Sequence, residues 1–209
     1  MAFSRRVVLL LPFVSAACGE VEPPQEYPVA RYDHLPQVRL AVADVEIDDS
    51  WAPRGAGRHV ENLAPTPPRE ALGQMGRDRL FAAGGPGRAV FVIEDASILR
   101  GADQYLGNFS VRVDVANAAG ELLTSATARA TRTRLIGGQS RNGVRSDLYE
   151  LVFDMMQDMN VELEYQLRRA LKDVPAARGP VSPQVEPVQI QELTNPAAPP
   201  GGMLPAEPE

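Results

Sequence analysis

The stretch SDLYELVFDMMQDMNVELEYQLRRALKDV, residues 146–174, carries the clearest structural signal in this chain. Its apolar side chains recur with a mean spacing of about 3.7 residues, which is typical of a helix lying across a sheet and exceeds the period of a left-handed coiled coil. This stripe consists of Leu148, Val152, Met155, Met159, Leu163, Leu167, Ala170 and Val174. We expect Ser146 to cap the helix, because the acids Asp147 and Glu150 follow it and bases lie near the end, as the helix dipole favours.

Four stretches before this helix have the pattern of strands. Residues 38–47 alternate and then change phase, which predicts a strand with a bulge near Asp44. Residues 89–93 are continuously apolar, as in the centre of a sheet. Residues 111–115 alternate valines with charged residues, and residues 122–131 place alanines on one face and polar residues on the other. These patterns predict a sheet with one face exposed to solvent.

A second helix is expected between the first two strands. Thr66 and Pro67 resemble an N-cap and a first helical position, and apolar residues recur at helical spacing as far as Ala83. The run Gly84–Gly87 would end this helix. The order β-α-β-β-β-α predicts a parallel first pair of strands followed by an antiparallel meander. We therefore expect an α+β domain over residues 37–174, a mixed β-sheet covered on one face by two helices.

Composition separates this domain from its extensions. The chain has 209 residues, and its 19 prolines crowd into residues 23–28, 53–68 and 175–208. We predict that residues 175–209 form a disordered, Pro-rich tail. Without Arg5 and Arg6 of the leader there remain 19 basic and 27 acidic residues, a net charge of −8. So acidic a chain is a poor candidate for binding nucleic acid, and none is expected as a partner.

The N-terminus reads as an export signal. Arg5 and Arg6 precede the apolar run Val7–Ala17, which is too short to span a bilayer, and the small residues 15–17 lead to Cys18, the sole cysteine. We predict a signal peptide at residues 1–17 and a lipid on Cys18 that holds the protein in the membrane. Ser15 stands where a lipobox usually has Leu, so ordinary cleavage after Ala17 is the alternative.

The residues after Cys18 bear on location. Gly19 rather than Asp follows the cysteine, which favours the outer membrane over the inner one, with the domain facing the periplasm. The inner membrane remains the alternative. Residues 18–36 are rich in proline and polar residues, and we expect them to be an extended, lipid-anchored tether.

Few residues suggest chemistry. His34 and His59 have no neighbours at metal-ligand spacing, and we interpret both as solvated loop histidines. Asp48 and Asp49 lack a calcium-loop pattern, and a turn at the end of a strand is the better interpretation. No glycine-rich phosphate loop follows a strand, and no serine sits in a nucleophile elbow. We expect no catalytic residues, no metal ligands and no cofactor.

Two clusters have a functional and a structural interpretation. Met155, Met156 and Met159 would suit an adaptable groove for a lipid or a partner helix, but their spacing favours core packing. Five arginines cluster in an acidic chain and could contact a phosphate-bearing lipid or an acidic partner. An ordinary solvated face is the preferred interpretation for these arginines, which are Arg129, Arg132, Arg134, Arg141 and Arg145.

Residues 59–98, HVENLAPTPPREALGQMGRDRLFAAGGPGRAVFVIEDASI, resemble a family of uncharacterised bacterial envelope lipoproteins. The family's VEH segment is Val60-Glu61-Asn62 here, and Met75 stands where Trp is usual. The segments 78–80 (DRL), 95–98 (DASI) and the C-terminal helix match, and the resemblance covers most of residues 37–172. It implies no known activity. The architecture is more remotely similar to the auxiliary lipoproteins of lipid-transporting ABC systems.

These observations favour a noncatalytic accessory module of the cell envelope that binds a protein or lipid partner and assists transport or assembly. One alternative is a structural envelope protein that acts through residues 175–209. Another is an enzyme whose site the sequence does not reveal. The sequence sets no oligomeric state.

Overall fold

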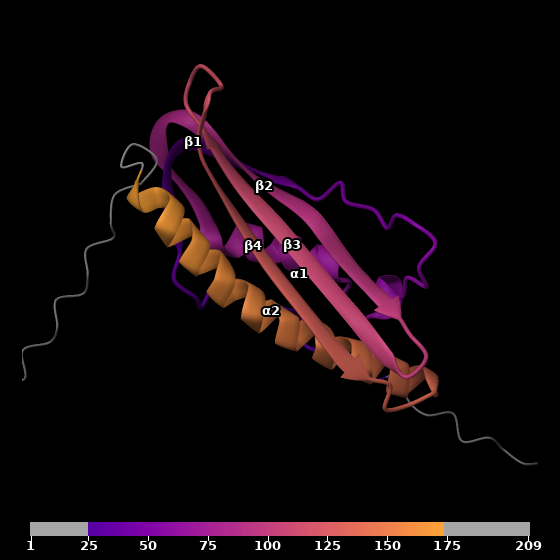
Figure 1. The fold of residues 1–209 in the computed structure, drawn as a ribbon. Coiled ribbons are helices and arrows are strands. Elements are labelled where there is room, and N and C mark those ends of the chain that lie inside the picture. The colour runs from indigo at the N-terminus through magenta and orange to yellow at the C-terminus, as the bar shows by residue number, and fades with distance from the viewer. Residues whose placement is uncertain (1–24, 174–209) are drawn as a thin grey trace, which may run out of the picture. The chain divides into compact units, whose positions relative to one another are not determined.

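The computed structural model describes residues 25–173, and it contains a four-stranded sheet and two long helices (Figure 1). The elements in chain order are β1 (Val38–Asp48), the short 3-10 helix η1 (Glu61–Leu63), α1 (Pro68–Arg79), β2 (Leu80–Arg100), β3 (Gln104–Ala116), β4 (Leu122–Leu135) and α2 (Arg141–Lys172). The strands lie in the order β1-β2-β3-β4. β1 pairs with β2 in parallel, and the later pairs are antiparallel. The predicted α+β class, element order and mixed sheet are confirmed.

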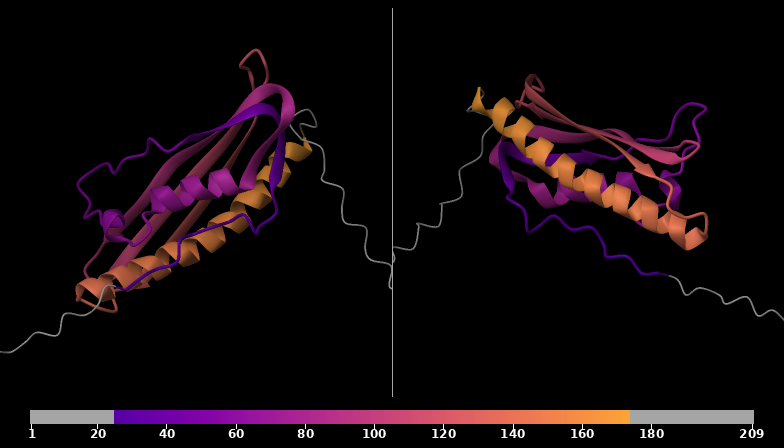
Figure 2. Two further views of the ribbon diagram at one scale, coloured as in Figure 1. Left: turned by 180° about the vertical axis from the view of Figure 1, so that it is seen from behind. Right: turned by 60° about the horizontal axis from the view of Figure 1, so that its bottom comes forward.

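Both helices cover the same face of the sheet (Figure 2). The core forms where the inward side chains of the strands meet the apolar stripe of α2 and one side of α1. On β3 the alternation is strict, since Val111, Val113 and Val115 are buried while Arg112 and Asp114 between them are partly exposed. The last two members of the predicted α2 stripe differ from this pattern. Leu171 is buried where Ala170 was expected, and Val174 lies outside the described residues.

The boundary between α1 and β2 was wrongly predicted. The helix begins at Pro68, without a side-chain cap from Thr66, and ends at Arg79. Leu80–Ala83 already belong to β2, and Gly84–Gly87 form a bulge inside that strand rather than a helix stop. The bulge requires glycine, because Gly85 has φ 153° and an added Cβ would collide with the backbone of Ala41 on β1.

The start of α2 was also wrongly predicted. The cap is Ser140, whose hydroxyl accepts a hydrogen bond from the Gly143 backbone N–H at 3.0 Å. Ser146 therefore lies inside the helix. Asp147, expected in the first turn, instead accepts hydrogen bonds from the backbone N–H groups of Gly137 and Gly138 in the preceding loop. The short polar run before Asp147 was consistent with either a loop or a helix, which is why periodicity alone misplaced the boundary.

The sheet and α1 approach each other closely at one glycine. A Cβ on Gly76 would lie 2.9 Å from Ile47 Cδ1 and 3.1 Å from Phe91 Cδ1, so any larger residue would push α1 away from β1 and β2. Gly73, three residues earlier, has room, since its nearest neighbour would be the flexible Arg77 side chain at 3.5 Å. Close helix–sheet packing therefore accounts for the glycine at position 76 but not for the one at position 73.

Candidate binding groove

A buried arginine joins both helices to the segment that precedes β1. Arg79 ends α1 with its side chain 1% exposed. Its guanidinium donates to the Pro36 carbonyl at 2.8 Å, to Asn160 Oδ1 at 2.8 Å and to Glu164 Oε2 at 2.9 Å. Burial lowers the pKa of Arg79, and the facing Glu164 carboxylate opposes that effect, so the side chain stays charged. We call this set of bonds the Arg79 latch.

Asp78, the residue before Arg79, holds the same segment at Tyr32, four residues before Pro36. Its carboxylate accepts from the Tyr32 backbone N–H at 2.9 Å and from Gln74 Nε2 at 2.7 Å, and Arg31 Nε lies 3.5 Å away. The Tyr32 side chain is buried beside it, and this burial, followed by the Asp78 charge, raises the pKa of the Tyr32 phenol. The DRL segment thus supplies two adjacent side chains that hold residues 31–36 against the helices.

The described part of the expected tether, residues 25–36, is therefore packed against the domain. We call it the N-terminal strap. Its far end rests on α2, where the Tyr27 ring lies 4.8 Å from the Tyr149 ring between centroids and Arg145 Cζ lies 5.7 Å from the Tyr27 centroid. Residues 18–24 lie outside the described residues.

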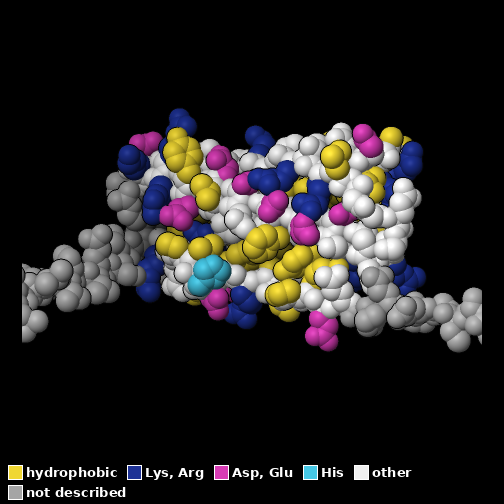
Figure 3. Space-filling view, turned by 90° about the horizontal axis from the view of Figure 1, so that it is seen from below, with side chains coloured by type: hydrophobic (Ala, Val, Ile, Leu, Met, Phe, Trp, Pro, Cys, Tyr) yellow, Lys and Arg dark blue, Asp and Glu magenta, His cyan; other side chains and the backbone are white. Residues whose placement is uncertain are grey.

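Between the N-terminal strap and α2 lies an apolar groove of about 560 Å³. The strap wall includes Val29 and Leu35, and the helix wall includes Phe153, Met156 and Val161. Figure 3 shows hydrophobic side chains gathered at the centre of the face on which α2 lies, with charged side chains around them. Several of the lining residues remain open to solvent, with Val29 79%, Phe153 53% and Val161 72% exposed. We call this the strap groove.

The helix wall of the strap groove explains an excess of apolar residues on α2. Packing on the sheet uses one stripe, and Tyr149, Phe153 and Val161 form a second one beside it at helical spacing. The methionine cluster serves the core as predicted, because all three side chains are buried. Met156 also lines the strap groove.

The strap groove was not predicted from the sequence. The available signals were the aromatic and apolar residues Tyr27, Tyr32 and Leu35 in a supposed tether, together with the second stripe on α2.

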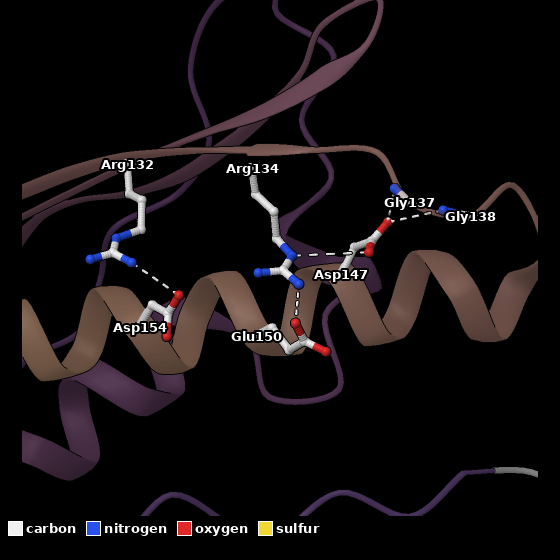
Figure 4. Close-up of polar contacts among 7 residues, drawn as sticks. All are labelled: Arg132, Arg134, Gly137, Gly138, Asp147, Glu150 and Asp154. Carbon is white, nitrogen blue, oxygen red and sulfur yellow. Dashed lines mark hydrogen bonds and ion pairs between the residues drawn. The ribbon is translucent and has the colours of Figure 1, made fainter.

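The arginine cluster is divided between solvent and the helix. Arg129 and Arg141 are exposed, as a solvated face requires. Arg132 and Arg134 point from β4 to α2 instead (Figure 4). Arg132 lies 3.0 Å from both Asp154 and Asp158, and Arg134 pairs with Glu150. Arg132 is exposed, as a solvated face requires, and Arg134 is partly exposed, so both form surface ion pairs with the acids of α2.

His59 is only partly exposed, so its assignment as a solvated loop residue was wrong. Its Nδ1 lies 3.4 Å from Oε1 of the buried Glu61, and its Nε2 lies 3.2 Å from the Arg54 carbonyl. Glu61 also accepts from the Ile98 backbone N–H at 3.4 Å. Of these contacts, the one at Nε2 joins His59 to the loop of residues 49–58. His59 Nδ1 and Glu61 Oε1 are both buried, and neither has a hydrogen-bond partner among the described residues.

Beneath that loop is a polar cavity of about 610 Å³, which also includes Glu94, Asp95 and Ser97. A histidine beside a carboxylate is the arrangement that would support catalysis. Here the carboxylates are engaged by neighbours, since Glu94 accepts from Ser110 Oγ at 3.0 Å and Asp95 accepts from the Ser97 N–H at 3.0 Å. The cavity reads as a structural polar network.

The remaining candidate residues have simple environments. His34 is exposed, as predicted, and lies at the rim of the strap groove. Asp48 accepts from the Ser50 backbone N–H at 3.0 Å, and hydrogen bonds from Ser50 lower the pKa of its carboxyl, which supports the strand-end turn. Cys18 lies outside the described residues, and its lipidation stays a prediction. Within residues 25–173, no group of three or more His, Cys, Asp or Glu could hold a metal ion, and no helix is long and apolar enough to cross a membrane.

The topology and the groove define an α+β protein with a mixed sheet, two helices on one face and a strap along one of them. The sequence matches no family model and no curated protein sequence. Among solved structures it is similar to a Xanthomonas campestris protein of the family DUF330, at 11% identity and TM-score 0.39 over 71% of this chain and 95% of that chain. It is also similar to a Caulobacter crescentus protein described as a candidate lipoprotein, at 17% identity and TM-score 0.25 over 57% of this chain and 90% of that chain.

The resemblance to envelope lipoproteins and the more remote similarity to transport auxiliary proteins both stay predictions. At these TM-scores neither structure carries an argument about function, and the fold assignment rests on the strand order and pairing.

Proposed function

We propose that this chain is a noncatalytic binding module of the bacterial cell envelope, anchored at the outer membrane by a lipid on Cys18 and facing the periplasm. The observation that carries this proposal is the strap groove, a concave apolar surface whose two walls are held in place by named contacts. Apolar concavities of some hundreds of Å³ are the usual form of binding sites.

The polar groups of the described residues support the noncatalytic part of the proposal. The three strongest candidates for reactive side chains are His59, Glu94 and Asp95. His59 lies close to the Arg54 carbonyl, and Glu94 accepts a hydrogen bond from Ser110 on the neighbouring strand. Asp95 accepts from the Ser97 backbone N–H of its own strand. A catalytic group needs free access to a substrate as well as a suitable charge state. The groove, in contrast, has exposed apolar side chains that no described residue covers.

The experiment is a cross-linking study in cells. Phe153 is replaced with a photo-reactive amino acid, and Leu135 on β4, which is also exposed but outside the groove, receives the same group as a matched control. We expect a discrete cross-linked product from position 153 and none from position 135. Equal labelling at both positions, or none at either, would contradict the proposal.

The anchor is tested separately by the intact mass of the mature protein and by density separation of the membranes. A mature chain that carries no lipid on Cys18, or that floats with the inner membrane, would refute that part of the proposal.

A further inference from the structure

The strap groove also indicates what kind of molecule it takes, if it is the binding site of the proposed module. We infer that the groove holds an acyl chain of a phospholipid from the membrane to which the protein is attached. Three features support this occupant: the size and lining of the groove, its compensated rim charge, and the length of chain that leads to it.

The size and lining fit a small apolar molecule. A volume of about 560 Å³ lies within the range of roughly 300–1,000 Å³ that single-ligand sites occupy. A folded partner would need about 800 Å² of its surface to be covered for a stable complex, which this narrow groove does not offer. Water is a poor occupant, because a site lined by groups such as Val29, Phe153 and Val161 provides few hydrogen-bond partners.

The rim carries little net charge. Arg31 lies at the edge of the groove, but its guanidinium is 3.1 Å from Asp33 and 3.5 Å from Asp78. Asn160, at the floor, is satisfied as well, since it accepts from Arg79 and donates to the Met156 carbonyl at 2.8 Å. With these polar groups already paired, recognition must come from the apolar part of the ligand rather than from its headgroup.

The covalent path places the groove near a bilayer. The strap begins at Gln25, and the seven residues from Cys18 to that point span at most about 25 Å when extended. A bilayer with its headgroups is about 40 Å thick, so this reach is slightly more than the depth of one leaflet, about 20 Å, and it keeps the start of the strap close to the membrane surface. Phospholipid acyl chains are the most abundant apolar molecules at that position.

The experiment uses the full chain and the fluorescent fatty acid cis-parinaric acid as the probe, with saturated fatty acids of increasing length as competitors. We expect saturable binding, and each added methylene should strengthen competition about fourfold until the groove is full. Phe153→Asp and Val161→Asp should weaken binding by about tenfold or more. Tyr165→Asp is the matched control, because Tyr165 is an aromatic residue on α2 that is 58% exposed and does not line the groove.

All three substitutions are at exposed positions, and thermal unfolding confirms that each variant is folded. Equal probe binding by the control and the groove variants, or no dependence on chain length, overturns the inference.

Further measurements identify which acyl chain occupies the groove, and they distinguish a failure of this inference from a failure of the proposed function. In full chains isolated from membranes, native mass spectrometry should show a co-purifying phospholipid, which Val161→Asp loses and Tyr165→Asp keeps. If the lipidated chain binds no probe while Cys18→Ala binds it, the groove holds the protein's own anchor and the inference falls. If the probe does not bind but the cross-linker at position 153 captures a protein, the acyl-chain inference fails while the binding module stands.

Discussion

Replacing Arg79 with alanine should release the N-terminal strap and cost a large part of the stability of the domain. The side chain is buried and makes three charge-assisted hydrogen bonds, to Pro36, Asn160 and Glu164. Each such bond contributes about 1.5–3 kcal/mol, but Glu164 is partly exposed and would regain water. Removing one member of a buried ion pair typically costs about 3–5 kcal/mol, and we expect a loss in this range.

The measurement is urea unfolding followed by circular dichroism. With a slope of about 2 kcal/mol per molar urea, the unfolding midpoint of Arg79→Ala should fall by roughly 2 M. Arg77→Ala is the matched control, because Arg77 is an exposed arginine on the same helix, and it should change the free energy of unfolding by less than about 0.5 kcal/mol. Tryptic cleavage after Arg31 should also become faster in Arg79→Ala. A loss below about 1 kcal/mol, as for a surface ion pair, would refute the latch.

Three other predictions concern packing, capping and pH. Gly76→Ala should destabilise the domain by about 1–3 kcal/mol through overpacking, whereas Gly73→Ala should stabilise it by up to about 1 kcal/mol. Thermal melts measure both variants, and equal effects would be inconsistent with the close approach of α1 to the sheet. Ser140→Ala should cost about 1 kcal/mol by removing the α2 cap, and Ser146→Ala should have little effect, with the reverse order contradicting the helix start. Because the pKa of the Tyr32 phenol is raised, the neutral phenol stabilises the fold at every pH below about 10, the ordinary tyrosine value, and this stability is lost as the pH rises further. Tyr32→Phe should therefore reduce alkaline unfolding, as measured by an absorbance titration. An unchanged unfolding profile would argue against the burial of Tyr32.

The core could be predicted from the sequence because its signals are periodic. The valine alternation in β3 and the stripe on α2 each reflect one element packing on one surface, which is what a period of two or of about 3.6 residues records. The bulge near Asp44 was also predicted correctly, since a phase change in the alternation leaves a trace in the sequence.

The boundaries and the groove could not be predicted in the same way. Gly84–Gly87 has the composition of a helix stop, and only its pairing opposite Ala41 reveals a bulge. The groove depends on contacts between residues far apart in the chain, such as Tyr32 with Asp78 and Arg79 with Glu164. No local pattern encodes these contacts, so the segment before β1 was interpreted as a tether from its proline and polar composition.

The parallel pairing of β1 with β2 sets the order in which the sheet can assemble. Short connections at residues 101–103 and 117–121 join β2, β3 and β4, whereas β1 reaches β2 only after residues 49–79 have closed around α1. Closing the longer segment costs more chain entropy before any contact forms. We therefore expect amide hydrogens of β1 to exchange faster than those of β3, and equal protection would contradict this order. Until it docks, β1 is an unpaired strand that can associate with another chain, and the Arg79 latch secures the part of the fold that closes last.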